Sequence, residues 1–222
     1  INNPKIINTF LNKLDTSTEL TKIDVLTPKT FLFSKYTNQL KFPLILKSVY
    51  SINSKDIYII ANQNQFDYLK ISIENHDAYI IQQYIGSIDD EYTTTVYKDK
   101  NRLEVITFKR KLTGGMTSFA TICNEETITN YAKKIAESFN LNGSINIQSR
   151  KVGNEFYIFE INPRFSSTVF IRDHFGFQDV LWWVNNFSKN VIFNLDNIKG
   201  LRLRILNSLE DTKGMLKALN RL

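Results

Sequence analysis

The sequence predicts an α+β protein, in which amphipathic helices and short strands follow one another along the chain. Residues 156–162 (FYIFEIN) form a short apolar run rich in aromatic and branched side chains, which is typical of a strand. Residues 125–140 carry acidic side chains in their first turn and place Ile128 and Ile135 on one face, which is typical of a helix. At 222 residues the chain can fold as one large domain or as two small ones.

The composition is ordinary for a globular protein, with 42% hydrophobic and 23% charged residues. No apolar run reaches the roughly 20 residues that cross a bilayer, and no secretory signal is visible, so we expect no membrane partner. Cys123 is the only cysteine, which excludes an intrachain disulfide and favours a cytoplasmic location. The net charge of +6 comes with scattered lysines and no nucleic-acid motif, so we expect a basic cleft for a polyphosphate and no nucleic-acid partner.

The first part of the chain predicts two helices. Residues 4–14 have apolar side chains at helical spacing. Residues 15–22 continue as a second helix, which Asp15 or Thr16 can cap.

A strand, a loop and a second strand come next. Residues 42–49 (FPLILKSV) form a strand with Lys47 near its end, and the polar loop at 51–56 leads into the strand at 57–60. Residues 64–73 then place apolar side chains at helical spacing.

The middle of the chain predicts three more strands. Residues 78–85 (AYIIQQYI) form a buried strand, and residues 91–97 (EYTTTVY) alternate in polarity. Residues 103–111 (LEVITFKRK) form a strand with a basic end, followed by a flexible loop that contains two glycines. Because side chains alternate along a strand, Lys109 and Arg110 point in opposite directions, so that one of them faces a cleft and the other points outward. We favour Arg110 for the cleft, with Lys109 as the alternative.

Residues 145–162 predict a β-hairpin, and its register decides which polar side chains meet. A two-residue loop at the Gly-Asn turn signal would set Gln148 opposite Phe159, on the wrong face. A loop of three residues pairs Val152 with Phe156 and sets Gln148 opposite Glu160. We predict the three-residue loop.

The predicted hairpin gathers oxygen-bearing side chains at its end. Glu160 and Asn162 share a face with Gln148, and their amide and carboxylate oxygens are ligands that Mg²⁺ accepts when it also binds phosphates. Arg164, just past the strand end, can hold an anion with two hydrogen bonds. The alternative interpretation is a strand end with a fortuitous glutamate before a proline-terminated turn.

The run EINPR at 160–164, with a glutamine twelve residues upstream, resembles the metal-binding end of ATP-grasp enzymes, especially the branch of the carbamoyl-phosphate synthetase large chain. The resemblance implies an ATP-grasp fold of two α+β lobes with ATP between them. It divides the chain into a remnant of an N-terminal linker or helix at 1–27, a small lobe at 28–84 and a large lobe with a C-terminal helix at 85–222. Since the chain opens with Ile1, we expect the upstream N-terminal domain of the family to be largely absent.

The resemblance also assigns roles to individual residues. In the family, basic side chains contact the nucleotide phosphates, a hinge strand contacts adenine, and a glutamate binds the ribose hydroxyls. The implied nucleotide-binding residues are Lys13, Lys47, Lys55, Gln82, Tyr84, Ile85 and Glu91. Gln82 stands where the family usually has glutamate, and its side-chain carbonyl can still bond an amino group.

The implied reaction is ATP-dependent ligation. A substrate carboxylate is activated as an acyl phosphate, and an amine or a similar nucleophile then displaces phosphate. Mg²⁺, which Mn²⁺ can replace, is implied on Gln148, Glu160 and Asn162, and the implied catalytic residues are Lys47, Arg110 and Arg164. The expected partners are small-molecule carboxylate and amine substrates, with room for a homodimer.

The alternative function is an ATP-binding module with little or no turnover, in a sensing or structural role. Its support is the loop at 51–56, where the family is rich in glycine and this chain has none. Without glycine the backbone is less free to wrap a phosphate.

Overall fold

The computed structural model of the protein describes residues 2–50, 56–113 and 116–187. Lys55, most of the loop at 51–56 and the expected C-terminal helix lie outside the described residues. Internal contacts group the chain into two units, Ile1–Asp179 and Val180–Leu222, and every strand of the described residues belongs to the first. Within the described ranges, no helix combines the length and apolar character that crossing a membrane requires.

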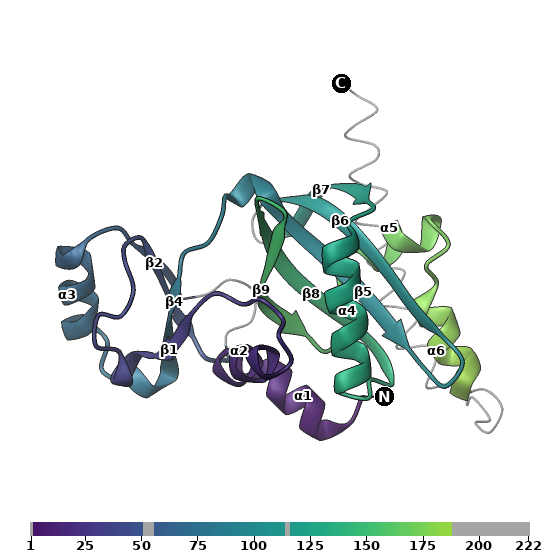
Figure 1. The fold of residues 1–222 in the computed structure, drawn as a ribbon, viewed down its shortest axis with the longest axis horizontal. Helices are drawn as coiled ribbons and strands as arrows, with labels where there is room; N and C mark the ends of the chain where they lie inside the picture. The colour runs from purple at the N-terminus through teal and green to yellow at the C-terminus, as the bar shows by residue number, and fades with distance from the viewer. Residues whose placement is uncertain (1, 51–55, 114–115, 188–222) are drawn as a thin grey trace, which may run out of the picture. The chain divides into compact units, whose positions relative to one another are not determined.

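Four of the described strands form one antiparallel sheet, in the order β1-β4-β2-β3 (Figure 1). These strands are β1 (Thr30–Leu32), β2 (Leu44–Ser48), β3 (Ile57–Ile60) and β4 (Tyr79–Gln83). Three of them confirm strands that the sequence predicts, whereas β1 is too short to leave a clear pattern of its own. Two 3₁₀ turns, at Phe33–Lys35 and His76–Ala78, connect elements of this sheet.

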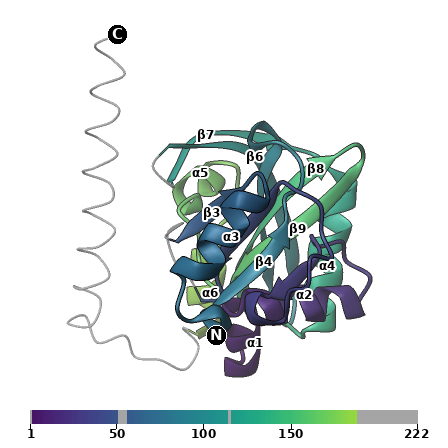
Figure 2. The ribbon, with the colours of Figure 1, turned by 90° about the vertical axis from the view of Figure 1, so that its left-hand side faces the viewer.

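Helix α3 (Gln63–Ser72) covers one face of the four-stranded sheet (Figure 2). Phe66 projects from α3 into a core that includes Leu44, Leu46 and Ile81 of the sheet. The helix begins where the Asn62 side chain accepts a hydrogen bond from the backbone N–H of Gln65, at 3.1 Å. The predicted helix at 64–73 is therefore confirmed, and burial of its apolar face attaches it to the sheet.

The other five described strands form a second antiparallel sheet, in the order β7-β6-β5-β8-β9 (Figure 1). They are β5 (Glu91–Lys98), β6 (Leu103–Thr113), β7 (Met116–Cys123), β8 (Gly143–Val152) and β9 (Glu155–Asn162). Strand β7 corrects the expectation of a flexible loop after residue 111. Leu112 and Thr113 belong to β6, and they pair with Thr117 and Met116 of β7.

Three helices pack on this second sheet. They are α1 (Pro4–Leu11), α2 (Lys13–Lys22) and α4 (Glu126–Ser138). Phe10 and Leu20 of the first two helices share one core with Ile128 of α4 and Ile145 of β8. After β9 come α5 (Val169–His174) and α6 (Asp179–Phe187), and the 3₁₀ turn Ile88–Asp90 precedes β5.

The cap of α2 differs from the prediction. Asn12 caps this helix, because its side chain accepts hydrogen bonds from the backbone N–H of Leu14 and Asp15, at 2.9 and 3.1 Å. Asn12 also ends α1, so the break between the two helices comes before Lys13 and not at Asp15 or Thr16. One asparagine therefore serves both ends, and Lys13 becomes the first residue of a helix.

The hairpin β8–β9 contains a β-bulge. Val152 pairs with Glu155, which leaves a loop of two residues, so the predicted three-residue loop is wrong. The register shifts at the pair Gln148 and Ser149, because Gln148 lies opposite Glu160 and an extra residue, Phe159, has no partner in the ladder. The predicted pairing of Gln148 with Glu160 is therefore confirmed, although a bulge and not a longer loop produces it.

The physical reason for the two-residue loop is strand twist. Two-residue hairpin loops match the right-handed twist of the flanking strands, and Gly153 supplies the positive φ of +60° that such a turn requires. The extra residue that a three-residue loop would have contained lies instead inside β9, as the bulged residue Phe159. As a result both Phe159 and Glu160 line the same cavity, although they are neighbours in sequence.

The connection at residues 84–90 joins the two sheets and passes close to the end of β8. Gly86 has a φ of +64°, a left-handed conformation that favours glycine. A Cβ atom at this position would lie 3.2 Å from Val152 Cγ2 and 3.3 Å from Arg150 Cβ. The connection therefore lies directly against β8, and the missing side chain permits this approach.

Replacing Gly86 by alanine should lower the free energy of unfolding by about 2–3 kcal/mol, because the methyl group adds overlap with β8 to left-handed strain. Gly153→Ala is the matched control: Gly153 has a similar φ of +60°, but no atom lies within 4 Å of an added Cβ. It should cost about 1 kcal/mol. Urea unfolding measures both variants, and equal losses would contradict the close packing at Gly86.

Candidate functional site

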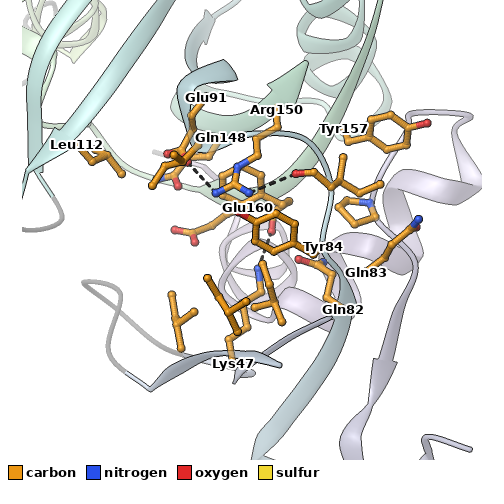
Figure 3. A pocket seen from close by; sticks show the side chains of 17 residues that line it. Lys47, Gln82, Gln83, Tyr84, Glu91, Leu112, Gln148, Arg150, Tyr157 and Glu160 are labelled. Atoms are coloured by element: carbon orange, nitrogen blue, oxygen red, sulfur yellow. Dashed lines mark hydrogen bonds and ion pairs between the residues drawn. The ribbon is translucent and has the colours of Figure 1, made fainter. Parts of the chain in front are cut away.

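A cavity of about 230 Å³ has lining residues from strands of both sheets and from the connection between them (Figure 3). Its apolar lining includes Ile45, Ile57, Ile59, Ile85, Ile88 and Leu112. Its polar lining includes Lys47, Gln82, Glu91, Gln148, Arg150 and Glu160. An apolar pocket with a few convergent polar groups is the usual form of a small-molecule site.

Lys47 projects from β2 and joins the two sheets. Its side chain is 4% exposed, and its Nζ donates a hydrogen bond to the carbonyl oxygen of Phe159, at 3.3 Å. That carbonyl belongs to the bulged residue of β9. Burial lowers the pKa of Lys47 to about 8, against the attraction of Glu160 and Glu91, while Lys13 and Arg150 lower it further.

Lys13 is buried at the start of α2. Burial lowers its pKa, and the nearby charge of Glu160 opposes this shift. The electrostatic coupling of Lys13 to both Glu160 and Lys47 places it near the basic end of the cavity. Lys13, which the resemblance implied as a phosphate contact, is not among the described residues that line the cavity and therefore lies behind them.

The predicted metal ligands lie together on the second sheet. Gln148 and Glu160 are paired across β8 and β9, and both line the cavity. Asn162 donates a hydrogen bond from Nδ2 to Glu160 Oε1 at 2.8 Å, which leaves the amide oxygen of Asn162 able to accept. The set has one carboxylate and two amides, and the described residues contain no group of three or more His, Cys, Asp or Glu side chains placed to hold a metal ion. Oxygen donors of this kind fit a hard cation such as Mg²⁺.

The orientation of the Gln82 side chain follows from a chain of hydrogen bonds. Thr30 lies opposite Gln82 in the sheet, and its hydroxyl donates to the carbonyl oxygen of Pro28 at 2.8 Å. Having used its single proton, the hydroxyl accepts from Gln82 Nε2 at 2.7 Å. The carbonyl oxygen of Gln82 is therefore the amide atom that can accept a hydrogen bond from a ligand.

Glu91 and Arg110 form a buried ion pair. Glu91 Oε1 accepts hydrogen bonds from Arg110, at 2.7 Å from one terminal nitrogen and at 3.3 Å from Nε. Arg110 is buried, whereas Lys109 pairs with Asp90 at the surface. Because its guanidinium pairs with Glu91, Arg110 is not among the described residues that line the cavity.

Arg150 lines the cavity, and sequence reasoning missed it. Its guanidinium donates to the carbonyl oxygen of Ile85 at 3.2 Å and to Glu91 Oε2 at 3.5 Å. It also lies 5.1 Å from the ring centre of Tyr84 (Figure 3). The signal was present in the sequence, because Arg150 stands two residues after Gln148 and alternation puts both on one face.

Arg164 follows Asn162 and is not among the described residues that line the cavity. Its side chain is exposed and donates a hydrogen bond to the carbonyl oxygen of Phe165 at 3.1 Å. Asn162 does not appear among the described residues that line the cavity either, and Lys55 lies outside the described residues. The structure thus brings together Lys47, Gln82 and Glu91 with the two paired residues Gln148 and Glu160.

Two antiparallel sheets with a cavity between them, together with the match to an ATP-grasp family model, place the chain in the class of ATP-grasp proteins. Within this class, the chain belongs to the family described as ATP-grasp in the biosynthetic pathway with Ter operon, whose model matches residues 76–206. The predicted ATP-grasp fold is confirmed, while the narrower resemblance to carbamoyl-phosphate synthetase stays a prediction.

Solved structures show the same fold at low sequence identity. N5-carboxyaminoimidazole ribonucleotide synthetase from Thermus thermophilus is 15% identical, with a TM-score of 0.63 over 75% of this chain and 48% of that one. The synthetase from Staphylococcus aureus, complexed with ADP, is 17% identical, with a TM-score of 0.65 over 76% and 48%. D-alanine–D-alanine ligase from Bacillus anthracis is 13% identical, with a TM-score of 0.61 over 81% and 67%.

The chain spans about half the length of the synthetase structures that it matches. Among curated protein sequences, none is similar enough to count as a relative. At identities below 20%, these likenesses establish the fold and leave the reaction to be argued from the site.

The low pKa of Lys47 predicts a specific pH dependence of stability. The unfolded chain keeps the proton up to about pH 10.5 and the folded chain only to about pH 8, so the cost of burying this charge disappears as pH rises between these values. Relative to Lys47→Met, which has no charge at this position, the wild type should therefore gain on the order of 3 kcal/mol from pH 8 to 10.5.

Urea unfolding of both proteins at several pH values measures this gain, because groups common to both cancel in the difference. Lys151→Met is the control, since Lys151 holds a surface ion pair with Glu125 that raises its pKa. If the difference in unfolding free energy between wild type and Lys47→Met stays constant from pH 8 to 10.5, folding does not lower the pKa of Lys47, and the prediction is wrong.

Proposed function

We propose that the protein binds Mg-ATP in this cavity and uses it to activate a substrate carboxylate for ligation to an amine or a similar nucleophile. One observation carries the proposal: four largely buried basic side chains and only two carboxylates lie in or directly behind the lining of one partly apolar cavity. Lys47 and Arg150 line the cavity together with Glu91 and Glu160, while Arg110 pairs with Glu91 and Lys13 is coupled to Lys47 and Glu160 from behind the lining. Burying such an excess of positive charge is costly unless an anion compensates it, and a polyphosphate supplies that anion.

The lining of the cavity supports an assignment for each part of the nucleotide. At the connection between the sheets, the accepting oxygen of Gln82 and the backbone at Tyr84 and Ile85 suit the edge of adenine. Glu91 lies at the start of β5, just after this connection, and its carboxylate suits the ribose hydroxyls. Lys47, at the other end of the polar lining, suits the phosphates, because an ammonium group binds them as a point charge.

Gln148, Glu160 and Asn162 are the residues that would hold Mg²⁺, which Mn²⁺ can replace. When bound together with a nucleotide, the ion would neutralise charge on the phosphates and orient them. Asn162 keeps Glu160 in place through their 2.8 Å hydrogen bond, so the carboxylate is held before any ligand arrives. Holding ligands in advance reduces the ordering that binding requires.

The proposed chemistry follows from positioning and charge. An oxygen of the substrate carboxylate attacks the γ-phosphorus, the bond to the β-phosphate oxygen breaks, and ADP and an acyl phosphate result. The amine then attacks the acyl carbon, phosphate leaves, and the amine loses a proton to solvent. Lys47 stabilises the charge on the transferring group, and Arg164, exposed just past β9, is available to hold the acyl phosphate.

A second candidate function is nucleotide binding without turnover, as a sensing or structural module. The specific observation in its favour is the placement of the predicted catalytic arginines. Arg110 is committed to Glu91, and Arg164 is exposed and bonded to a backbone carbonyl. A binding module needs neither of them near the phosphates. The expected small-molecule substrates, a homodimer and the cytoplasmic location remain part of the first proposal.

Isothermal titration of the full chain with Mg-ATP tests binding. Glu160→Gln should weaken Mg-ATP binding roughly tenfold or more, because it removes the only carboxylate of the proposed metal set. Glu125→Gln is the matched control, since Glu125 pairs with Lys151 away from the cavity, and it should bind like the wild type. Heat signals that do not saturate for the wild type would refute the proposed function.

Phosphate release distinguishes the two candidates. Wild-type protein with Mg-ATP, supplied with pools of small carboxylates and amines, should release phosphate in a carboxylate-dependent manner if it is a ligase. Tight Mg-ATP binding without such release would favour the binding module.

Thr30→Val tests the orientation of Gln82. Without the accepting hydroxyl, the Gln82 amide is free to turn, and either its NH₂ or its oxygen can face the base. The preference for ATP over GTP should therefore fall by roughly tenfold, because an amide that can also donate accommodates the guanine carbonyl. Competition binding with both nucleotides measures the ratio. Thr18→Val, which alters an exposed helix hydroxyl, is the control, and a preference that survives in Thr30→Val would contradict the assignment.

A further inference from the structure

Arg150 is held opposite Glu91 by the pairing of β5 with β8. Residues directly opposite each other on neighbouring strands have Cβ atoms about 5 Å apart, so their side chains must run side by side or meet. The Arg150 side chain meets both Glu91 and the connection between the sheets, and it is 13% exposed. The register of β5 and β8 therefore determines that Arg150 lies next to Glu91.

The guanidinium of Arg150 joins two groups that belong to different parts of the cavity. One terminal nitrogen donates to the carbonyl oxygen of Ile85 at 3.2 Å, and the other donates to Glu91 Oε2 at 3.5 Å. The guanidinium carbon lies 5.1 Å from the ring centre of Tyr84 and 5.8 Å from that of Phe159. The two rings restrict the plane of the fork, and the fork determines where the carbonyl and the carboxylate lie.

The packing of Gly86 is independent evidence that the connection is fixed at this point. An added Cβ would lie 3.3 Å from Arg150 Cβ and 3.4 Å from the carbonyl oxygen of Lys151. The backbone next to Ile85 therefore rests on β8 at Arg150 itself. Backbone contact and side-chain hydrogen bonds thus hold the same segment in the same place.

We propose that Arg150 is a positioning residue that fixes the Ile85 carbonyl and the Glu91 carboxylate at the spacing a ribonucleotide requires, and so sets the sugar selectivity of the site. The proposal rests on the proposed function, which gives adenine to the connection and the ribose to Glu91. Arg110 holds Glu91 through Oε1, so Oε2 is the oxygen whose direction Arg150 controls. A carboxylate oxygen with a fixed direction distinguishes a sugar with two hydroxyl groups from one with a single hydroxyl group.

Lysine cannot replace this arginine. An ammonium group is a point charge on a flexible stem, and it cannot span the carbonyl and the carboxylate as a planar fork does. Both Arg150→Ala and Arg150→Lys should therefore lose the effect, although Arg150→Lys retains the charge. This separates positioning from simple electrostatic attraction to phosphate.

The test measures the dissociation constants of Mg-ATP and Mg-2′-deoxy-ATP for the full chain by isothermal titration. Wild type should bind ATP more tightly than 2′-deoxy-ATP. Arg150→Ala should bind ATP roughly tenfold more weakly and 2′-deoxy-ATP only slightly more weakly, so the ratio of the two constants shrinks. Lys151→Ala is the matched control: it removes one positive charge from the neighbouring position, whose side chain pairs with Glu125, and should keep the wild-type ratio.

Circular dichroism establishes that each variant is folded, and Arg150→Lys decides the matter if Arg150→Ala does not fold. An unchanged ratio in a folded Arg150 variant overturns this proposal and leaves the proposed function standing. Equal wild-type affinity for the two nucleotides also overturns it. A wild type that binds neither nucleotide overturns the proposed function, and the role of Arg150 with it.

Discussion

The β-bulge at Phe159 is the feature on which the site depends. By inserting one unpaired residue into β9, it brings Glu160 opposite Gln148 and turns Phe159 and Glu160 toward the same cavity. It also leaves the Phe159 carbonyl outside the strand ladder, where Lys47 of the other sheet donates a hydrogen bond to it. A bulge is a local departure from regular pairing, and here it positions the proposed metal ligands, forms part of the cavity wall and links the two sheets.

The charges around the cavity form one electrostatic system. Burial of Lys47 is costly, as its lowered pKa shows, and Glu160 and Glu91 offset part of that cost. Glu91 in turn lies between Arg110 and Arg150 and forms an ion pair with each of them. Lys47 and Arg150 line the cavity and Lys13 lies behind it, which is why we propose an anionic ligand rather than a neutral one.

Sequence reasoning succeeded where chemistry and periodicity coincide. Lys47 near a strand end and Glu160 in the hairpin both line the cavity, as the residue types at these positions suggested, although Glu160 lies opposite Gln148 only because of the bulge. It was less successful for the arginines. Arg110 was expected near a phosphate and pairs with Glu91 on the neighbouring strand, and Arg150 was overlooked although it shares a face with Gln148. Long basic side chains form ion pairs with residues on neighbouring strands, and the order of strands in the sequence does not show which strands are neighbours in the sheet.

By itself, the sequence determined the α+β class, most of the elements and the polar residue types at the hairpin end, since these follow from local patterns of burial and backbone preference. Only the tertiary structure decided the two-residue loop, the bulge that compensates for it and the pairing of Glu91 with two arginines. The reason is that register and cross-strand partners depend on twist and on contacts between segments distant in the chain. Those contacts decide which of the available charges face the cavity.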